Sequence, residues 1–107
     1  MFQTIDAAEL SRLIESGRPP QIVDVRTAGE VAGGTLPGAL HIELSTLPAR
    51  LSELDSEAPI VFVCRSGARS AQACGYLVQR GFGGVCNLGG GIAGWMRAGL
   101  PLNGLDR

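Results

Sequence analysis

The sequence has little excess charge of either sign and no long hydrophobic run, and each absence excludes a class of protein. Nine Lys and Arg residues stand against ten Asp and Glu, a formal net charge of −1, so no basic surface for nucleic acid or anionic lipid is expected. No apolar run approaches the ~20 residues that a membrane-spanning helix needs. The first ten residues, MFQTIDAAEL, have neither the basic segment nor the apolar stretch of a secretory signal. We therefore expect no nucleic-acid or membrane partner and a cytoplasmic location.

Cysteine and histidine are also scarce, which argues against a disulfide scaffold and against a metal site. The three cysteines, Cys64, Cys74 and Cys86, are odd in number and form no C-x-x-C pair. In a reducing compartment this pattern is not that of a disulfide-stapled protein. The one histidine is His41, so a zinc site would need it together with all three thiols. We expect neither a metal nor another cofactor.

What the sequence does contain is the composition of one globular α/β domain. It has 107 residues, 45% hydrophobic and 18% charged, with no repeat, low-complexity tract or linker, so one domain is expected over residues 1–107. Continuous apolar strands that alternate with amphipathic helices indicate a parallel sheet covered on both faces. The predicted strands are 21–25, 39–42, 60–63 and 84–88. The predicted helices lie within 5–17, 27–34, 45–54, 70–81 and 90–99.

Capping and turn residues refine these helices. Asp6 caps the first helix, with Glu9 three residues on, and Gly17 ends it. Its expected apolar face is Leu10, Leu13 and Ile14. In the segment 45–54, Pro48 must lie in the first turn. The apolar face there is Leu47, Leu51 and Leu54. The inward residues of 70–81 are expected to be Ala73, Cys74, Leu77 and Val78, with Gly81 as its stop.

The stretch VFVCRSGARS holds the strongest candidate for chemistry. Cys64 follows the strand 60–63, at the end of a parallel strand where ligands bind. The backbone N–H groups and the dipole of the next helix favour negative charge there, and Arg65 and Arg69 add positive charge, so the thiolate is favoured. Gly67 lets the loop bend. The alternative is a structural Cys64 with solvated arginines, but the combination favours a reactive cysteine.

Three segments resemble the rhodanese-like sulfurtransferases. CRSGARS resembles the active-site loop C-x-x-G-x-R of that family, and IVDVRTAGEVAGGTLPGALHI is similar to its segment D-V-R…E…G-H-I-P-G-A-x-N-I. NLGGGIAGWMRAGLPL resembles its ending, L-x-G-G…W…A-G-L-P. The resemblance implies a single rhodanese-like domain with a five-stranded, mostly parallel sheet flanked by helices on both faces. The fifth strand would lie near Phe2–Thr4.

The resemblance also implies a mechanism. The Cys64 thiolate takes the outer sulfur from thiosulfate or a persulfide donor, and the resulting persulfide passes it to a thiol, a protein thiol or cyanide. Arg65 would bind the anionic donor, Arg69 would share that role or brace the loop, and Ser70 would support the loop as a helix-start hydroxyl. The implied site is the nucleophile Cys64 and the loop Arg65, Ser66, Gly67, Ala68, Arg69 and Ser70.

Other activities remain as alternatives at this point. The same persulfide would serve a sulfur relay to a partner protein, and a regulatory domain would bind without turnover. Phosphatases of the same fold use C-x5-R, whereas Cys64 to Arg69 is the shorter C-x4-R. The smaller ring of amides favours a single sulfur over phosphate or arsenate.

Several further residues have a structural reading. Asp24 and Arg26 match D-V-R. An Arg26–Glu30 pair four residues apart would hold the second helix in support of the site. The alternative is a catalytic role for Asp24 or Arg26, since strand ends face the site. Thr35 stands where the family has His, which removes a polar anchor from that turn. His41 stands where it has Asn, and is expected to be a satisfied strand-end histidine.

The remaining notable residues are expected in the core or on the surface. Cys74 and Cys86 are expected to be small buried hydrophobes rather than resolving thiols. Trp95 is expected in the core, with a wall of the site entrance as the alternative. The acidic stretch 52–57 is expected to be a solvated helix end.

Overall fold

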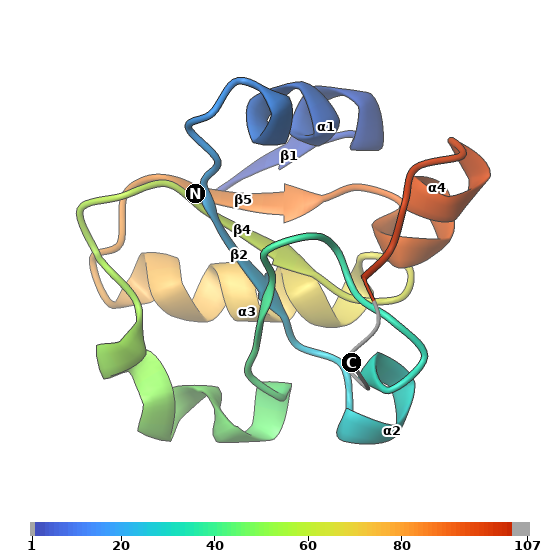
Figure 1. Cartoon of the computed structure of the whole chain (residues 1–107). Coiled ribbons are helices and arrows are strands. Elements are labelled where there is room, and N and C mark those ends of the chain that lie inside the picture. Colours follow the sequence, from blue (N-terminus) through green and yellow to red (C-terminus); the bar gives the residue numbers. More distant parts are fainter. Residues whose placement is uncertain (1, 104–107) are drawn as a thin grey trace.

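A computed structural model describes residues 2–103, which form a five-stranded sheet with helices on both faces (Figure 1). The strands are β1 (Gln3–Ile5), β2 (Gln21–Asp24), β3 (Leu40–His41), β4 (Ile60–Val63) and β5 (Val85–Leu88). Their order is β1-β5-β4-β2-β3, and every pairing is parallel. The helices are α1 (Ala7–Glu15), α2 (Ala28–Val31), the 3-10 helix η1 (Leu44–Glu53), α3 (Ala68–Gln79) and α4 (Gly91–Arg97). The predicted α/β architecture is confirmed.

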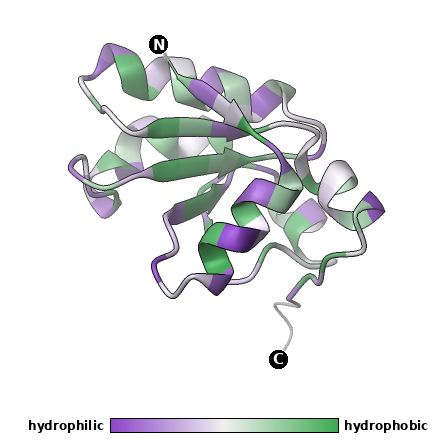
Figure 2. Cartoon of the chain, turned by 90° about the horizontal axis from the view of Figure 1, so that it is seen from above, coloured by the Kyte–Doolittle hydropathy of each residue, from purple (hydrophilic) through white to green (hydrophobic). Residues whose placement is uncertain are grey.

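Strand β4 lies in the middle of the sheet, and its four residues are all buried. Because successive side chains of a strand point to opposite faces, Phe62 joins the core beneath α3 and η1, while Val61 and Val63 join the core beneath α1 and α4. Figure 2 shows hydrophobic residues along the strands and hydrophilic ones on the outer surfaces of the helices. This double burial is why the sequence of β4 is continuously apolar.

Helix α1 begins at its predicted cap but turns a different face to the core. Asp6 accepts a hydrogen bond from the Glu9 N–H at 2.8 Å, as expected. Leu10 is fully buried, whereas Leu13 is 40% exposed, so its predicted core position is wrong. Ala7, Leu10 and the partly buried Ile14 follow the three-and-four spacing of one helical stripe, and Leu13 lies at the margin of that stripe.

Segment η1 is a 3-10 helix, and Pro48 lies inside it rather than in its first turn. Proline has no N–H to donate and its ring clashes with the preceding turn, so a continuous α-helix cannot form around it. The predicted apolar face survives: Leu47 and Leu54 are buried and Leu51 packs partly against the same core. The rest of the acidic stretch 52–57 is exposed, as expected.

Helix α3 begins at Ala68, two residues earlier than expected, directly after Gly67 in the left-handed conformation (φ +112°). Its core-facing residues are Ala73, Cys74 and Leu77, with Val78 partly buried. The early start draws Ser70 into the first turn of the helix, where its side chain is buried. The loop after Cys64 is therefore short and tight.

The C-terminal part of the described chain closes over the α1 side of the sheet. Trp95 of α4 is 1% exposed, and its indole N–H donates to the Pro101 carbonyl at 2.8 Å. The core position expected for Trp95 is thus confirmed. Thr35 and Asn103 form an isolated antiparallel bridge that ties the turn after α2 to this segment. Within residues 2–103, no helix is long and apolar enough to cross a membrane.

Candidate active site

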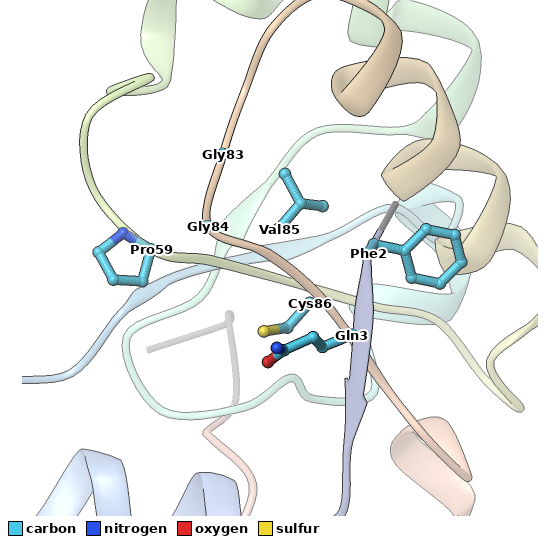
Figure 3. Close-up of a pocket in the computed structure, with 7 residues that line it drawn as sticks. All are labelled: Phe2, Gln3, Pro59, Gly83, Gly84, Val85 and Cys86. Carbon is cyan, nitrogen blue, oxygen red and sulfur yellow. The ribbon is translucent and has the colours of Figure 1, made fainter.

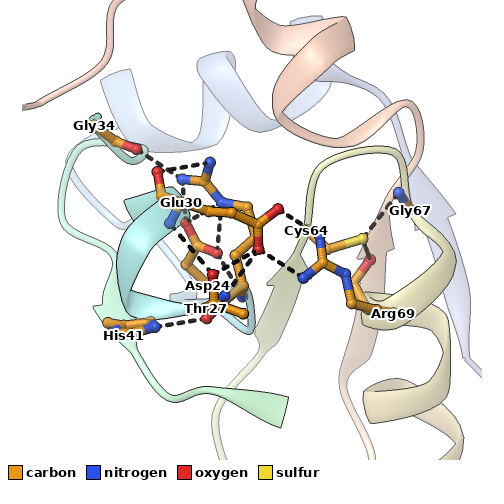
Figure 4. A network of polar contacts seen from close by, with 10 residues as sticks. Asp24, Thr27, Glu30, Gly34, His41, Cys64, Gly67 and Arg69 are labelled. Atoms are coloured by element: carbon orange, nitrogen blue, oxygen red, sulfur yellow. Dashed lines mark hydrogen bonds and ion pairs between the residues drawn. The ribbon is translucent and has the colours of Figure 1, made fainter. Parts of the chain in front are cut away.

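Cys64 follows β4 at the carboxyl edge of the sheet, beneath the loop that leads into α3. The residue is 1% exposed. The Gly67 N–H donates to its Sγ at 3.0 Å, and the Ser70 hydroxyl lies 3.4 Å from the same atom (Figure 4). The sequence therefore folds so that the loop curls around one sulfur atom.

These contacts determine the ionisation of the sulfur. Burial by itself raises the pKa of Cys64, but hydrogen bonds from the Ser70 hydroxyl and from the backbone N–H groups of Ser70, Gly67 and Ser66 outweigh it and hold the pKa below its usual 9.0. Each of these groups stabilises the thiolate more than the thiol. The pKa is lowered as predicted, but the causes that lower it most are the loop hydrogen bonds and not the charges of Arg65 and Arg69 that were also expected to contribute.

Arg69 does not face the sulfur as a free charge. Its two terminal nitrogens donate to the two carboxylate oxygens of Glu30 at 2.7 and 2.9 Å (Figure 4). This ion pair, with a further hydrogen bond from the Thr27 N–H, lowers the pKa of Glu30 to about 2, and the same pair raises the pKa of Arg69. Of the two roles left open for Arg69, its geometry matches the bracing one, because it joins the start of α3 to α2.

The expected Arg26–Glu30 side-chain pair does not form. Arg26 instead forms an ion pair with Asp24: its Nε lies 3.0 and 3.1 Å from the two carboxylate oxygens, and a terminal nitrogen lies 2.8 Å from one of them. Arg26 also donates a hydrogen bond to the Gly34 carbonyl at 2.7 Å. Arg26 reaches Glu30 only at its main-chain carbonyl, at 3.4 Å. Arg69 and Thr27 compete with Arg26 for the Glu30 carboxylate. Arg69 forms an ion pair with it, and the Thr27 N–H donates to it, which completes a capping box at the start of α2.

Thr35 supplies a polar anchor of its own to the turn after α2. Its hydroxyl donates to the buried Asp24 carboxylate at 2.7 Å, so the expected loss of an anchor at this position is wrong. His41 behaves as predicted, with Nε2 2.7 Å from the Arg26 carbonyl at the end of β3. Asp24, Arg26, Thr35 and His41 thus form a supporting network beside the loop. Asp24 and His41 are labelled in Figure 4.

Two residues of the site were missed by the sequence reasoning. Asn87 of β5 accepts a hydrogen bond from the Ser70 hydroxyl and donates to the Gly67 carbonyl at 3.1 Å. The signal was a polar side chain in an otherwise apolar strand that borders β4. Ser70 lies in the first turn of α3, as expected of a helix-start hydroxyl, and its buried side chain also contacts the sulfur.

Gly91 is the second missed residue, and it fixes the loop from the α4 side. The N–H groups of Ile92 and Ala93 donate to the carbonyls of Cys64 and Arg65 at 2.8 and 3.0 Å. A Cβ added at Gly91, where φ is +57°, would lie 2.4 Å from the Cys64 carbonyl oxygen. Only glycine allows α4 to approach this closely. The run of three glycines that leads into α4 was the available signal.

Comparison with known proteins agrees with this geometry. The family model of the rhodanese-like domain matches residues 6–98. The chain belongs to the rhodanese-like family. A protein of Allochromatium vinosum named sulfurtransferase is 45% identical over 102 residues, which make up 95% of each chain. Thiosulfate sulfurtransferase GlpE of Pseudomonas aeruginosa is 35% identical over 94 residues, 88% of this chain and 84% of that protein.

The fold comparison points the same way. The crystal structure of a rhodanese-related protein from Thermoplasma volcanium matches this chain with a TM-score of 0.86 at 28% identity, covering 95% of this chain and 98% of that one. The named relatives support a sulfurtransferase role for this rhodanese-like chain.

Arg65 lies on the solvent-exposed side of the loop between Cys64 and α3. Its side chain is exposed, and within residues 2–103 it has no hydrogen-bond or ion-pair partner. It borders a hollow of about 280 Å³ between α2, α4 and the loop, whose other wall includes Ile92 and the 57% exposed Met96. Arg65 is therefore available to a ligand, whereas Arg26 and Arg69 are committed to carboxylates. Ser66 on the loop and Ala68 at the start of α3 are also exposed.

A second hollow, of about 460 Å³, opens where β4 and β5 begin, at the far end of these strands from Cys64 (Figure 3). Cys86 borders it and is half-buried, so the expected full burial holds only for Cys74. Burial raises the pKa of both thiols, and that of Cys74, with the nearby Cys86 as a further cause, reaches about 12. Both are therefore poor nucleophiles. Within residues 2–103, no cluster of three or more His, Cys, Asp and Glu residues is placed to hold a metal ion.

Proposed function

We propose that this rhodanese-like chain is a thiosulfate sulfurtransferase that carries the transferred sulfur as a Cys64 persulfide. The observation that carries the proposal is the thiolate site: one cysteine sulfur at the end of β4, hydrogen bonded by the loop N–H of Gly67 at 3.0 Å and facing Ser70. The lowered pKa of Cys64 increases the fraction of thiolate, which is the nucleophilic form of the side chain.

In the first step the Cys64 thiolate attacks the outer sulfur of thiosulfate. A new S–S bond forms to Sγ, the S–S bond of thiosulfate breaks, and its electron pair leaves with sulfite. Before the step, the thiolate carries one negative charge and thiosulfate carries two. After it, the persulfide carries one and sulfite carries two. No proton moves, which suits a sulfur whose side-chain neighbour is a hydroxyl rather than an acid or base.

Arg65 is the group proposed to bind the anionic donor. It follows Cys64 in the chain, is exposed, and is free of carboxylate partners within the described residues. A guanidinium can donate two parallel hydrogen bonds to the oxygens of the thiosulfate sulfonyl group. Two hydrogen bonds from Arg65 to those oxygens would orient thiosulfate with its outer sulfur toward Cys64.

In the second step an acceptor removes the outer sulfur from the Cys64 persulfide. The acceptor is a thiolate, which becomes a persulfide, or cyanide, which becomes thiocyanate, and in either case the Cys64 thiolate is regenerated. The loop N–H groups that stabilise the starting thiolate also stabilise it as the leaving group. The same contacts therefore assist both halves of the cycle.

A sulfur relay to a protein thiol is the second candidate, favoured by one observation. Met96 of α4 is a large apolar side chain left 57% exposed beside Arg65, on the rim of the hollow next to the loop. An exposed apolar side chain on the rim of the hollow that Arg65 borders would give a docked partner protein an apolar contact. The three free cysteines fit a reducing compartment, and we place either activity in the cytoplasm. The short C-x4-R loop disfavours phosphate and arsenate chemistry.

Intact-protein mass spectrometry tests the proposal. After incubation with thiosulfate, the protein is expected to gain one sulfur atom, which a reductant removes. Cys64→Ser should show no gain, while the matched control Cys86→Ser, which removes a half-buried thiol outside the loop, should gain sulfur as the parent does. Loading that persists in Cys64→Ser, or is lost in Cys86→Ser, would move the nucleophile elsewhere.

A further inference from the structure

Asn87 is a buried polar side chain placed beneath the active-site loop. It is the third residue of β5, is 7% exposed, and is flanked in that strand by Cys86 and Leu88. Strand β5 pairs in parallel with β4, and Asn87 lies opposite Phe62, two residues before Cys64. Its side chain meets the loop at two points, Ser70 and Gly67. A buried amide has to be satisfied, and here both ends are satisfied by the groups that contact the sulfur.

The two hydrogen bonds fix which way the amide points. The Gly67 carbonyl can only accept, so the group 3.1 Å from it is the Asn87 NH₂. The Asn87 oxygen then faces the Ser70 hydroxyl and must accept its proton. The orientation of Asn87 and the direction of the Ser70 hydrogen bond therefore follow from one fixed acceptor.

Ser70 has one hydroxyl proton and two acceptors for it. One is the Asn87 oxygen and the other is Cys64 Sγ at 3.4 Å. When the sulfur is a thiol, Ser70 can donate to Asn87 and accept from the S–H. When the sulfur is a thiolate, the hydroxyl stabilises it only by turning away from Asn87. Asn87 and the sulfur thus compete for one proton.

The other end of Asn87 acts on a different donor to the same sulfur. The Gly67 N–H makes the 3.0 Å hydrogen bond to Sγ, while the carbonyl of Gly67 is held by the Asn87 NH₂. Gly67 has a left-handed φ of +112°, which glycine adopts without strain, so its carbonyl can turn toward β5. Asn87 anchors that carbonyl from the next strand.

We propose that Asn87 is a positioning residue that sets the hydrogen bonding of the Cys64 sulfur, competing for the Ser70 proton with one end of its amide and fixing Gly67 with the other. Asn87 does not touch the sulfur itself. The proposal deepens the proposed function, since it takes Cys64 as the nucleophile. When sulfur is added, the negative charge moves to the outer atom and Sγ becomes a weak acceptor. The Ser70 proton then returns to Asn87, so the pair follows the chemical state of the sulfur.

The pH dependence of Cys64 alkylation by iodoacetamide tests this in the full chain, in a Cys86→Ser background that removes the partly exposed thiol of Cys86. Asn87→Asp keeps an acceptor for Ser70, strengthens it by its charge, and loses the donor to Gly67. The alkylation midpoint should rise by at least about one pH unit, which is about tenfold slower alkylation at pH values below both midpoints. An unchanged midpoint would overturn the proposal.

A matched control and a cycle separate positioning from a general charge effect. Gln72→Glu adds the same charge on the exposed side of α3 and should leave the midpoint near that of the parent. In a Ser70→Ala background, the shift caused by Asn87→Asp should fall to half or less. An equal shift in both backgrounds, or an equal shift from Gln72→Glu, would show a simple field effect and overturn the role through Ser70.

A second variant, Asn87→Leu, tests the same competition if Asn87→Asp fails to fold. Asn87→Leu removes the competing acceptor, so the Ser70 hydroxyl is free for the thiolate, and Ser70→Ala should then raise the midpoint more than it does in the parent. If Ser70→Ala raises the midpoint in the Asn87→Leu background by the same amount as in the parent, or by less, Asn87 does not compete with the sulfur for the Ser70 proton. Alkylation needs no sulfur donor, so these outcomes are independent of whether the protein forms a persulfide. A chain that shows the coupling but gains no sulfur would refute the proposed function alone.

Discussion

Replacing Gly91 by alanine should damage both the fold and the site, because α4 touches the loop through this residue. The new Cβ would lie 2.4 Å from the Cys64 carbonyl oxygen and 2.5 Å from that of Arg65. Both atoms belong to the backbone and cannot rotate away. Restoring ordinary contact at 3.4 Å requires the loop and the helix to separate by about 1 Å. A shift of this size breaks the hydrogen bonds from Ile92 and Ala93 to the loop.

The expected cost follows from these losses. An L residue in the left-handed conformation costs about 1–2 kcal/mol, and two hydrogen bonds contribute about 1 kcal/mol each, so unfolding free energy should fall by about 3–4 kcal/mol. Urea unfolding measures this loss, and mass spectrometry after thiosulfate treatment measures sulfur loading, which should fall sharply because the loop has moved around Cys64.

Gly94→Ala is the matched control in the same helix. A Cβ there meets no atom closer than 3.6 Å, and the residue has no positive φ. Because alanine is the better helix former, this variant should be as stable as the parent or more stable by up to about 1 kcal/mol. If Gly91→Ala unfolds at the same urea concentration as Gly94→Ala and still loads sulfur, the close approach of α4 does not hold the loop, and the reasoning fails.

Three further substitutions test the groups around the loop. Glu30→Gln should lower stability at pH 7 by about 1 kcal/mol after allowance for solvent screening. The folded pKa of Glu30 is about 2, below its usual 4.5, so its contribution to the free energy of unfolding is full above pH 4.5 and disappears as the pH falls toward 2. Urea unfolding of the parent and of Glu30→Gln at both ends of that pH window checks this. A stability difference that stays the same at both ends contradicts it. Arg65→Ala should raise KM for thiosulfate far more than it slows transfer from an uncharged donor in steady-state assays, whereas equal losses would remove its binding role. Thr35→Val should cost about 1–3 kcal/mol by depriving the buried Asp24 of a donor, and Thr35→Ser should restore most of it in urea unfolding; equal stability of the two variants would refute the anchor.

The sequence was informative where local pattern and burial agree. The apolar run of β4 predicted a central strand, and the polar loop after it predicted where the reactive cysteine would lie. Resemblance to the rhodanese-like family supplied the number of strands and the place of β1, which three residues alone would not have indicated. These features depend on neighbours in the chain or on motifs, and both are readable without coordinates.

The errors arose where a long-range partner outcompeted a local one. Spacing by four residues predicted an Arg26–Glu30 pair, but Arg69, 39 residues away, binds Glu30 with two hydrogen bonds. Local rules also could not reveal that Asn87 would reach Ser70, because that contact depends on β5 lying beside β4. Such pairings are created by the sheet order and are absent from any local window of the sequence.

The thiolate and the donor are stabilised by different means, so salt should separate them. Cys64 is buried, and backbone and hydroxyl hydrogen bonds lower its pKa, with the charge of Arg69 already paired to Glu30. Arg65 is exposed, and its attraction for a dianion is screened once the Debye length falls from about 30 Å at 0.01 M to about 3 Å at 1 M salt. We expect the alkylation midpoint of Cys64 with neutral iodoacetamide to stay nearly constant across this range while KM for thiosulfate rises several-fold. Arg65→Ala should lose most of that rise. A midpoint that climbs with salt would mean that arginine charge, rather than the loop N–H groups, holds the sulfur ionised.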